Sequence, residues 1–205
     1  FTGDFKMNNL EIVNDYEFVQ SIFDGIFSCE KVETIGIYAF YSSVFTGVFN
    51  CPNLQTVGEY AFVNSQFNGV FNCPNLQTVG IAAFCYSVFD GAFECPNLQA
   101  VGDSAFRYSV FTGVFNCPNL QTVEQGAFYS SGFTGVFNCP NLQTVGEYAF
   151  VNSTFDTITI GANATLGTGC IGAHSTEFIA DYAANGKLAG TYVWDEVSGH
   201  WIYQT

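Results

Sequence analysis

The two histidines of this sequence, His174 and His200, are the side chains best suited to acid–base chemistry near neutral pH. A nucleophile–base site that combines Cys170 and His174 with Asp195 or Glu196 can be drawn, but nothing in the spacing of these residues favours it. The sequence also has no nucleophile elbow, phosphate-binding loop, metal-binding helix or paired-carboxylate motif. We therefore expect no catalytic residues and no enzymatic activity.

Most of the cysteines recur every 22 residues, a spacing that bears on both metal and disulfide chemistry. Zinc sites gather their ligands in close C-x-x-C pairs, which this spacing does not resemble, and we expect neither a metal nor a cofactor. If residues 22 apart stack on one another, their Cα atoms lie about 5 Å apart, but parallel Cα–Cβ directions hold the sulfurs poorly for bonding. We therefore expect a file of buried free thiols, which pack as small apolar side chains. This file contains Cys29, Cys51, Cys73, Cys95, Cys117 and Cys139.

A 22-residue repeat accounts for most of the 205-residue chain and supplies the elements that must position these side chains. Seven rows occupy residues 1–154, of which the first is the most degenerate and is expected to cap that end; residues 45–65 and 133–153 are identical. Phenylalanine recurs at positions 1, 5 and 18 of the rows, and Phe178 is the only one outside these files. Because no single row can bury its own phenylalanines, the rows must stack, with three ladders of rings through the interior.

Smaller and polar residues at fixed positions predict how each row turns and how neighbouring rows join. Glycine at position 3 indicates a tight bend or a close approach of coils, and proline at position 8 ends a strand and starts a turn. Asparagine at position 9 and serine at position 21 are expected to hydrogen-bond to the neighbouring coil. We expect short strands near positions 3–7 and 10–13, and a turn or short helix at positions 14–18. The glycines of position 3 are Gly3, Gly25, Gly47, Gly69, Gly91, Gly113 and Gly135.

The last segment, residues 155–205, does not repeat and suits a C-terminal cap, because an open end of the stack would expose both ring ladders and strand edges. After a final strand, Ser175 or Thr176 can N-cap a helix that Gly186 ends. The residues that follow predict a hairpin that turns at Ser198-Gly199 and carries aromatic side chains able to cover the end.

Rows two to seven share an Ala-Phe pair at positions 17 and 18, such as Ala39-Phe40 and Ala61-Phe62, and Phe155–Ile160 fits an L-x-x-L-x-L frame. In these features the chain resembles the BspA-like class of leucine-rich repeats, found in cell-surface proteins of host-associated bacteria and some protists. It departs from that class in its 22-residue period, in phenylalanine for most leucines, and in Cys-Pro for Ile-Pro. The resemblance implies a β-rich (α+β) leucine-rich-repeat solenoid of parallel stacked coils, with short strands, short helical turns and a C-terminal helix plus β-hairpin cap.

The net charge of −14, with four Lys and Arg residues against 18 Asp and Glu, argues against nucleic acid and anionic membranes as partners. No stretch approaches the ~20 consecutive apolar residues of a membrane helix, so we expect no membrane insertion. The resemblance instead implies an extracellular or cell-surface location, and adhesion through a protein partner on a host or neighbouring cell. A glycan-binding module and a passive structural spacer stay open as alternatives, and so does the oligomeric state.

A candidate partner-binding surface is indicated by positions 16, 19 and 20, which differ between rows that otherwise match. A strip rich in Tyr, Asn and Ser with a single Arg is typical of recognition surfaces, although the tyrosines can also simply cover the outer edge. Regular Asn and Gln files at positions 6 and 11 form a second candidate face, suited to a repetitive ligand such as a glycan. Because rows three and seven share even the variable positions, we expect specificity in rows four to six. The candidate residues are Tyr38, Tyr41, Tyr60, Tyr86, Arg107, Tyr108, Tyr129 and Tyr148.

Overall fold

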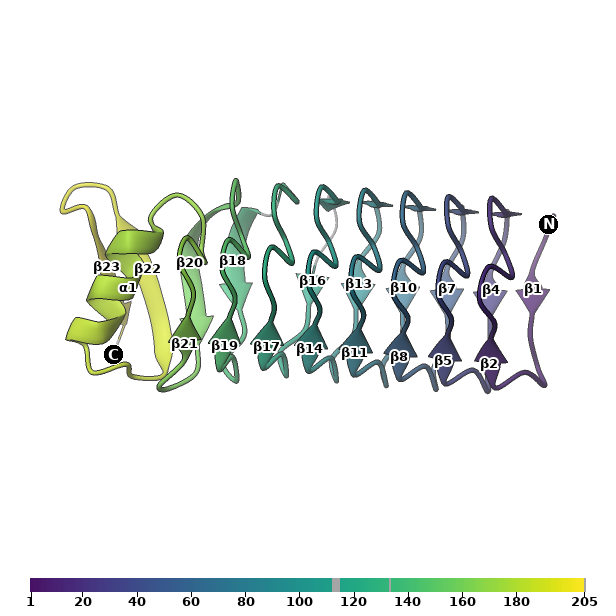
Figure 1. The fold of residues 1–205 in the computed structure, drawn as a ribbon, viewed down its shortest axis with the longest axis horizontal. Helices are drawn as coiled ribbons and strands as arrows, with labels where there is room; N and C mark the ends of the chain where they lie inside the picture. Colours follow the sequence, from purple (N-terminus) through teal and green to yellow (C-terminus); the bar gives the residue numbers. More distant parts are fainter. Residues whose placement is uncertain (112–114, 133, 205) are drawn as a thin grey trace.

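The computed structural model describes residues 1–111, 115–132 and 134–204. Its repeats form a rod of stacked coils, with the N-terminus at one end and the helix near the other (Figure 1). Residues 22 apart in sequence lie side by side in neighbouring coils, and the predicted solenoid of parallel stacked coils is confirmed. Gly113 and Phe133, which belong to the predicted glycine and phenylalanine files, lie outside the described residues.

Two parallel sheets along the rod lie where the sequence predicts strands, at positions 5–6 and 12–13. Strands of adjacent rows pair in register, as Phe49 does with Phe71 and Val57 with Val79. The first sheet contains β1 (Phe5–Lys6), β4 (Phe27–Ser28), β7 (Phe49–Asn50), β10 (Phe71–Asn72), β13 (Phe93–Glu94) and β16 (Phe115–Asn116). The second contains β2 (Ile12–Val13), β5 (Thr34–Ile35), β8 (Thr56–Val57), β11 (Thr78–Val79), β14 (Ala100–Val101), β17 (Thr122–Val123), β19 (Thr144–Val145) and β21 (Thr165–Leu166).

A third parallel sheet, which the sequence pattern does not predict, runs through positions 22 and 1. Two residues per strand are too few to show an alternating pattern. The strands arise from stacking, because the N–H groups of Val44 and Thr46 donate to the carbonyls of Ser21 and Phe23 in the preceding row. The sheet contains β3 (Ile22–Phe23), β6 (Val44–Phe45), β9 (Gln66–Phe67), β12 (Val88–Phe89) and β15 (Val110–Phe111).

Positions 14–21 form consecutive turns. The sequence left a turn or a short helix open for this segment, and the structure has the turn. In row two, the N–H of Tyr41 donates to the carbonyl of Tyr38, and that of Ser43 to Phe40. The N–H groups of Tyr38, Phe40 and Ser42 instead donate to carbonyls of the next row. Because backbone hydrogen bonds within a row alternate with backbone hydrogen bonds between rows, this segment joins neighbouring coils as the sheets do. We call positions 15–20 of the rows the turn edge.

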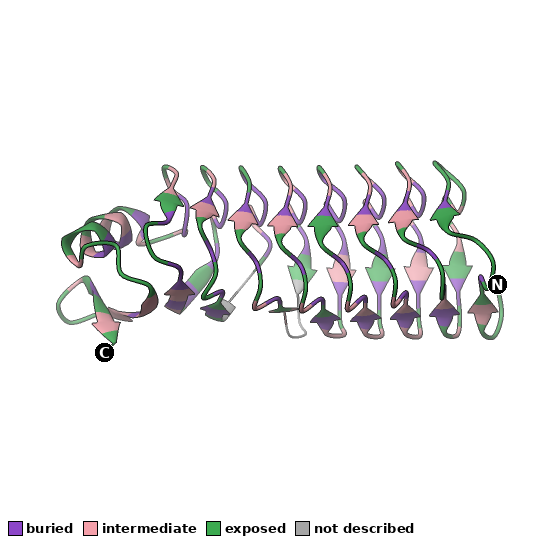
Figure 2. Cartoon of the chain, turned by 90° about the horizontal axis from the view of Figure 1, so that it is seen from below, coloured by how far each residue is buried: buried purple, intermediate pink, exposed green. Residues whose placement is uncertain are grey.

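Three ladders of phenylalanine rings fill the interior, as predicted, and buried residues recur at the same places in successive coils (Figure 2). Equivalent rings stack almost parallel, with centroids 4.9 Å apart for Phe49 and Phe71 and for Phe62 and Phe84. Rings of different ladders meet edge to face, as Phe71 and Phe84 do at 5.4 Å and 90°. Both geometries are favourable for aromatic pairs, so each ring stabilises packing along the rod and across it.

The predicted role of the glycine file is confirmed, and the predicted hydrogen bonds of the Ser and Asn files are made in some rows only. Within the described chain the buried hydroxyls of Ser131 and Ser153 have no partner. A Cβ atom on Gly69 would overlap the backbone carbonyl of Gly47 in the preceding row, so the coils approach closely there. The Ser65 hydroxyl donates to the carbonyl of Phe40 at 2.7 Å. The Asn53 side chain donates to a carbonyl of the preceding row at 2.6 Å. The Phe40 carbonyl also accepts from the N–H of Ser43, so these side-chain bonds add a link between a row and the preceding one.

The cysteines of position 7 form the predicted buried file, with one exception. Cys29 and Cys51 are joined by a disulfide, with Cα atoms 4.8 Å apart, so the prediction of free thiols is wrong for this pair. The row spacing lies within the Cα separation that a disulfide spans, and rotation about the side-chain bonds overcomes the parallel Cα–Cβ directions. Burial raises the pKa of Cys139 to about 12. The free cysteines of the file are Cys73, Cys95, Cys117 and Cys139.

A mixed sheet and a helix close the C-terminal end, as predicted (Figure 1). Strand β18 (Thr134–Asn138) pairs in parallel with β20 (Thr154–Ile160), and β20 pairs antiparallel with β22 (Gly190–Asp195). Strand β23 (His200–Gln204) completes a hairpin with β22, and helix α1 (Ser175–Ala184) packs against β23. No helix among the described residues is long and apolar enough to cross a membrane.

The predicted N-cap of α1 is wrong. The N-cap residue is His174, whose side chain makes no capping hydrogen bond. The Ser175 hydroxyl is buried and instead accepts from the N–H of Ile171 at 3.4 Å, because packing of the preceding loop draws it inward. Gly186, with φ of +69°, follows the end of the helix, as predicted.

Replacing the fully buried Phe84 by Ala is expected to lower the free energy of unfolding by about 3–5 kcal/mol, because it removes a ring from the stack and leaves a cavity. The matched control is Ile81→Ala on the exposed turn edge, which is expected to cost about 1 kcal/mol or less. Urea unfolding followed by circular dichroism measures both. Equal losses for the two variants would contradict the assignment of the interior.

Thiol counting tests the cysteine file. In denaturant, the chain is expected to present six thiols before reduction and eight after it, because one pair is joined. In the native state, alkylation is expected to be slow, since burial blocks access and keeps the thiols protonated. Mass spectrometry of the alkylated chain counts the labels, and eight labels before reduction would rule out the disulfide.

Candidate functional site

The turn edge holds positions 16 and 20 in the left-handed region of backbone space, for example Tyr60 at φ +56° and Tyr86 at φ +58°. This region costs a non-glycine residue roughly 1–2 kcal/mol, whereas glycine and asparagine adopt it more readily. Asn64, Gly126 and Asn152 occupy equivalent places in other rows. Tyrosine is thus present against the preference of the backbone, which points to a role for its side chain. The candidate tyrosines in this conformation are Tyr38, Tyr60, Tyr86, Tyr108 and Tyr148.

Tyrosines of the first three rows form one stack on the turn edge. The Tyr38 ring lies 5.3 Å from that of Tyr16 and 4.9 Å from that of Tyr60, nearly parallel to both. Tyr41 meets Tyr38 edge to face at 5.9 Å. Desolvation raises the pKa of Tyr38, and the neighbouring tyrosines raise it further, so its hydroxyl is a neutral hydrogen-bonding group. A shallow apolar hollow is lined by Val19 and by the rings of Tyr16, Tyr38 and Tyr41.

A second cluster surrounds Arg107 in rows four to six. Tyr86 stacks on Tyr108 at 5.1 Å, and Tyr108 meets Tyr129 edge to face at 5.8 Å. The Arg107 guanidinium carbon lies 5.0 Å from the centroid of Tyr108 and 4.9 Å from that of Tyr129, within cation–π range of both. A hydrogen bond from Arg107 to the Tyr108 hydroxyl raises the pKa of the guanidinium. The cluster therefore holds one fixed positive charge among aromatic rings.

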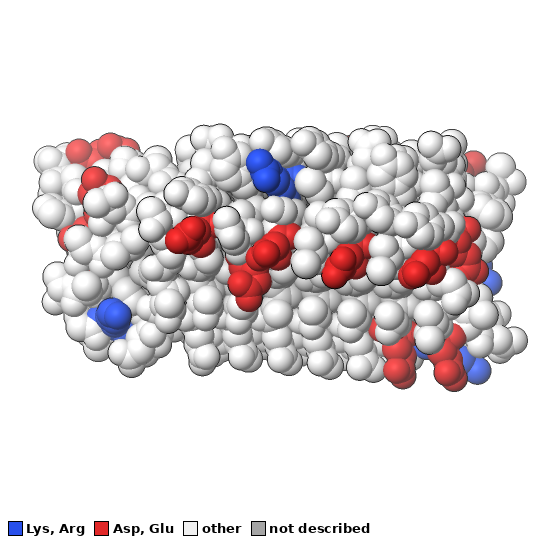
Figure 3. Space-filling model, in the orientation of Figure 1, with Lys and Arg blue, Asp and Glu red and all other residues white. Residues whose placement is uncertain are grey.

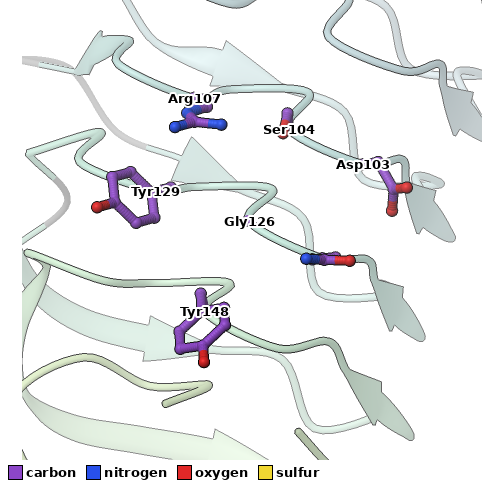
Figure 4. A pocket seen from close by; sticks show the side chains of 7 residues that line it. Asp103, Ser104, Arg107, Gly126, Tyr129 and Tyr148 are labelled. Atoms are coloured by element: carbon purple, nitrogen blue, oxygen red, sulfur yellow. The ribbon is translucent and has the colours of Figure 1, made fainter. Parts of the chain in front are cut away.

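Beside this cluster the turn edge is hollowed into a cavity of about 400 Å³ (Figure 4). It exists because the file of tyrosines at position 16 is interrupted by Ser104 and Gly126 in rows five and six. A Cβ atom on Gly126 would meet nothing closer than 3.6 Å, so the space above this residue is open. The cavity is lined by Asp103, Ser104, Arg107, Gln125, Gly126, Tyr129 and Tyr148.

The candidate residues all lie on the turn edge, but in three places rather than one. One group is the stack of the first rows, the second is the cluster around Arg107, and Tyr148 stands apart on the rim of the cavity. The sequence reasoning missed the polar residues of the cavity. The small residues at position 16 were the signal that could have found them, because they interrupt a ring file. The stack contains Tyr38, Tyr41 and Tyr60, and the cluster Tyr86, Arg107, Tyr108 and Tyr129.

The turn edge is bordered by acidic side chains. Figure 3 shows them in a line along the rod, with few basic side chains on the same face. They come from positions 14 and 15, directly before the tyrosine file, and are exposed to solvent. Arg107 is thus a positive charge on a surface that is otherwise negatively charged. The bordering acids are Asp15, Glu59, Asp103, Glu124 and Glu147.

The predicted second candidate face is wrong in one of its two files. The Gln side chains of position 11 line a polar groove with the asparagines of position 9, whereas the asparagines of position 6, such as Asn50 and Asn72, lie in the first sheet. The groove is lined by alternating Asn and Gln side chains of rows three to five, with Glu33 at one end. Asn53 also serves the scaffold, since its side chain donates to the carbonyl of Glu30 in the preceding row. Among the described residues, the side chains of Gln55 and Gln77 make no hydrogen bond within the chain. This face therefore offers a regular file of free amides and no aromatic surface.

The residues that could do catalytic chemistry do not form one site, although His174 and Glu196 line the same cavity. Cys170 is fully buried, with its sulfur 3.6 Å from the Ser175 hydroxyl. His174 stacks on Trp194 at 3.7 Å, and Asp195 accepts hydrogen bonds from the hairpin turn, which lower its pKa. The described part of the chain holds no group of three His, Cys, Asp or Glu residues that could bind a metal ion.

Comparison with known proteins bears on the repeats. A family model described as a BspA type leucine rich repeat region matches the chain in six copies, over residues 4–90 and 57–175. No curated protein and no solved structure matches the chain.

The left-handed backbone of the tyrosine file leads to a stability prediction. Tyr60→Asn is expected to change the free energy of unfolding by less than about 1 kcal/mol, because relief of backbone strain offsets the lost stacking on Tyr38. Phe62→Ala, two residues along, serves as the control and is expected to cost about 3–5 kcal/mol. Urea unfolding compares the two. A loss for Tyr60→Asn as large as that for the control would mean that the tyrosine is a structural residue.

Proposed function

Because the chain belongs to the BspA-type leucine-rich repeat family, whose repeats generally serve as surface protein-interaction modules, we propose that it is a non-enzymatic protein that binds a protein partner through its turn edge. The partner belongs to a host or neighbouring cell, and the interaction contributes to adhesion. The chain acts at the cell surface or after secretion.

One observation carries this proposal: tyrosine rings project from backbone positions that disfavour tyrosine. The candidate rings are exposed or half-buried, with 55% of Tyr86 and 45% of Tyr148 accessible. Tyrosine supplies a large, rigid and amphipathic contact surface at a low cost in side-chain entropy. The stacking of Tyr38 on Tyr60 and of Tyr86 on Tyr108 orders these rings before a partner arrives, which lowers that cost further.

The charge along the turn edge indicates the chemistry of the partner. A negative border around an aromatic strip is complementary to a partner surface that carries lysine or arginine. Such a surface is drawn to the edge at long range, and the attraction weakens as salt is added. Arg107 interrupts the negative border in row five, so it can set the register of the partner along the rod.

The proposal is tested with a variant that changes the side chains of the turn edge while respecting its backbone. Tyr38, Tyr60, Tyr86 and Tyr108 are replaced together by Asn, which suits left-handed positions. Partners of the parent chain are found on an array of secreted and cell-surface proteins, and their Kd values are measured by surface plasmon resonance. We expect the variant to bind at least about tenfold more weakly, since buried aromatic anchors dominate such interfaces.

A matched control changes the same number of residues on the other face, with Gln55, Gln77, Gln99 and Gln121 replaced by Ser. This control is expected to bind as the parent does. Unchanged binding by the tyrosine variant would remove the turn edge as the binding surface. Absence of any protein partner for the parent would contradict the proposal and favour a passive spacer.

A further inference from the structure

Arg107 is the only arginine of the chain, and it lines the cavity above Gly126 without a carboxylate partner. Among the described residues no acid lies within ion-pair distance of it, although the chain contains 18 Asp and Glu. Its Nε atom is buried and has no hydrogen-bond partner there, and among the described residues its guanidinium makes one hydrogen bond, from Nη2 to the Tyr108 hydroxyl at 3.4 Å. Because Nε is closed to solvent, the donors that can reach a ligand in the cavity are those of the two terminal nitrogens, Nη1 and Nη2.

The guanidinium is also held in place. It lies against the rings of both Tyr108 and Tyr129, which restrict its motion without consuming its in-plane donors. A planar guanidinium matches a carboxylate through two parallel hydrogen bonds. Because the tyrosine rings already hold the Arg107 side chain, less side-chain entropy is lost when an anion binds. The ligand group that suits Arg107 is therefore a carboxylate.

Other polar side chains of the cavity require a ligand that also carries hydroxyl groups. The side chains of Asp103, Ser104 and Gln125 line the same space, and within the described chain they make no hydrogen bond. A carboxylate such as Asp103 accepts hydrogen bonds from hydroxyls, and together with the exposed Glu124 and Glu147 it repels any anionic group that does not lie on Arg107. A sugar acid carries one carboxylate and several hydroxyl donors on a single ring, so one unit can pair both with Arg107 and with these acceptors.

The ring of Tyr148 provides an apolar wall. It comes from the row after Gly126, and Figure 4 shows it on the other side of Gly126 from Arg107. Unlike Tyr38 or Tyr60, it stacks on no other aromatic ring of the described chain. One side of the ring lies close to Gly169, which leaves the other side to a ligand. The C–H face of a sugar ring is apolar and packs on such a surface.

From this arrangement we infer that the cavity binds a carboxylated monosaccharide unit, such as a sialic or uronic acid. The carboxylate lies on Arg107, the hydroxyls hydrogen-bond to Asp103 and Gln125, and the ring packs on Tyr148. A volume of about 400 Å³ lies near the lower end of the range of small-molecule pockets and suits a single ring. The site goes beyond protein binding and does not depend on it, because a free sugar can enter the cavity without a partner protein.

Paired ligands test the role of the carboxylate. The whole chain is titrated with glucuronic acid and with glucose, which differ in the carboxylate alone, and with 3′-sialyllactose and lactose. Isothermal calorimetry and ¹H–¹⁵N chemical shifts report binding. We expect at least one acidic sugar to bind on the order of 10- to 100-fold more tightly than its neutral counterpart, because a charge-assisted pair is gained. Arg107→Gln is expected to remove this preference.

A second pair of variants tests the cavity itself. Gly126→Tyr restores the interrupted ring file and fills the space. The backbone already suits it, since φ is +58° at Gly126 and +56° at Tyr60. Ala82→Tyr makes the same kind of change at the equivalent position of row four, where the residue does not line this cavity. We expect Gly126→Tyr to abolish sugar binding and Ala82→Tyr to retain it. Ala82→Tyr is expected to unfold as the parent does, whereas Gly126→Tyr is expected to fold but to unfold at a lower urea concentration, because glycine adopts the left-handed region more readily.

The inference would be overturned by equal binding of acidic and neutral sugars, or by failure of both acidic sugars to bind. Sugar binding that is retained in Gly126→Tyr would also overturn it. A glutamate-rich peptide that binds more tightly than the sugar acids, and displaces them, would overturn it in favour of an acidic protein segment. These titrations contain no partner protein, so their failure is independent of whether the protein array yields a partner.

Discussion

Equivalent phenylalanine rings in adjacent rows stack 4.9 Å apart, which is the distance at which parallel strands hydrogen-bond. Because the two distances agree, one coil-to-coil step satisfies the ring ladders and all three sheets together. An inserted residue in a row would move phenylalanines out of their ladders, so the 22-residue period is a packing requirement. The same step brings Cys29 and Cys51 within disulfide range, and leaves no room for a Cβ atom on Gly69.

The interior therefore constrains most positions of a row, and positions 16, 19 and 20 of the turn edge are those that can differ. There the coils are joined through backbone groups, which do not depend on side-chain identity. Tyr60, Ala82 and Gly126 accordingly occupy the same left-handed place in different rows. Variation at this place creates a ring stack in the first rows and a cavity in the middle ones. A uniform scaffold thus presents a non-uniform surface.

Much of the fold could be predicted from the sequence, since the Phe, Gly and Ser files report directly on stacking. The third sheet could not, because strands of two residues such as Val44–Phe45 are created by row-to-row bonding and carry no local pattern. The disulfide and the buried Ser175 depend on side-chain rotation and loop packing, which the sequence pattern does not report. The candidate tyrosines were visible as variable positions. The cavity was not visible in the sequence, because it forms where Ser104 and Gly126 carry no large side chain.

The central claim is that the ladders specify the fold while the variable positions of the turn edge specify what is bound. One measurement separates the two. In a variant chain, positions 16, 19 and 20 of rows four to six are replaced by the residues of row three, namely Tyr60, Val63 and Asn64, and ligand binding by this variant is measured. The account predicts a chain that folds as the parent does and has lost its binding. Binding equal to that of the parent, or a chain that no longer folds, would contradict it.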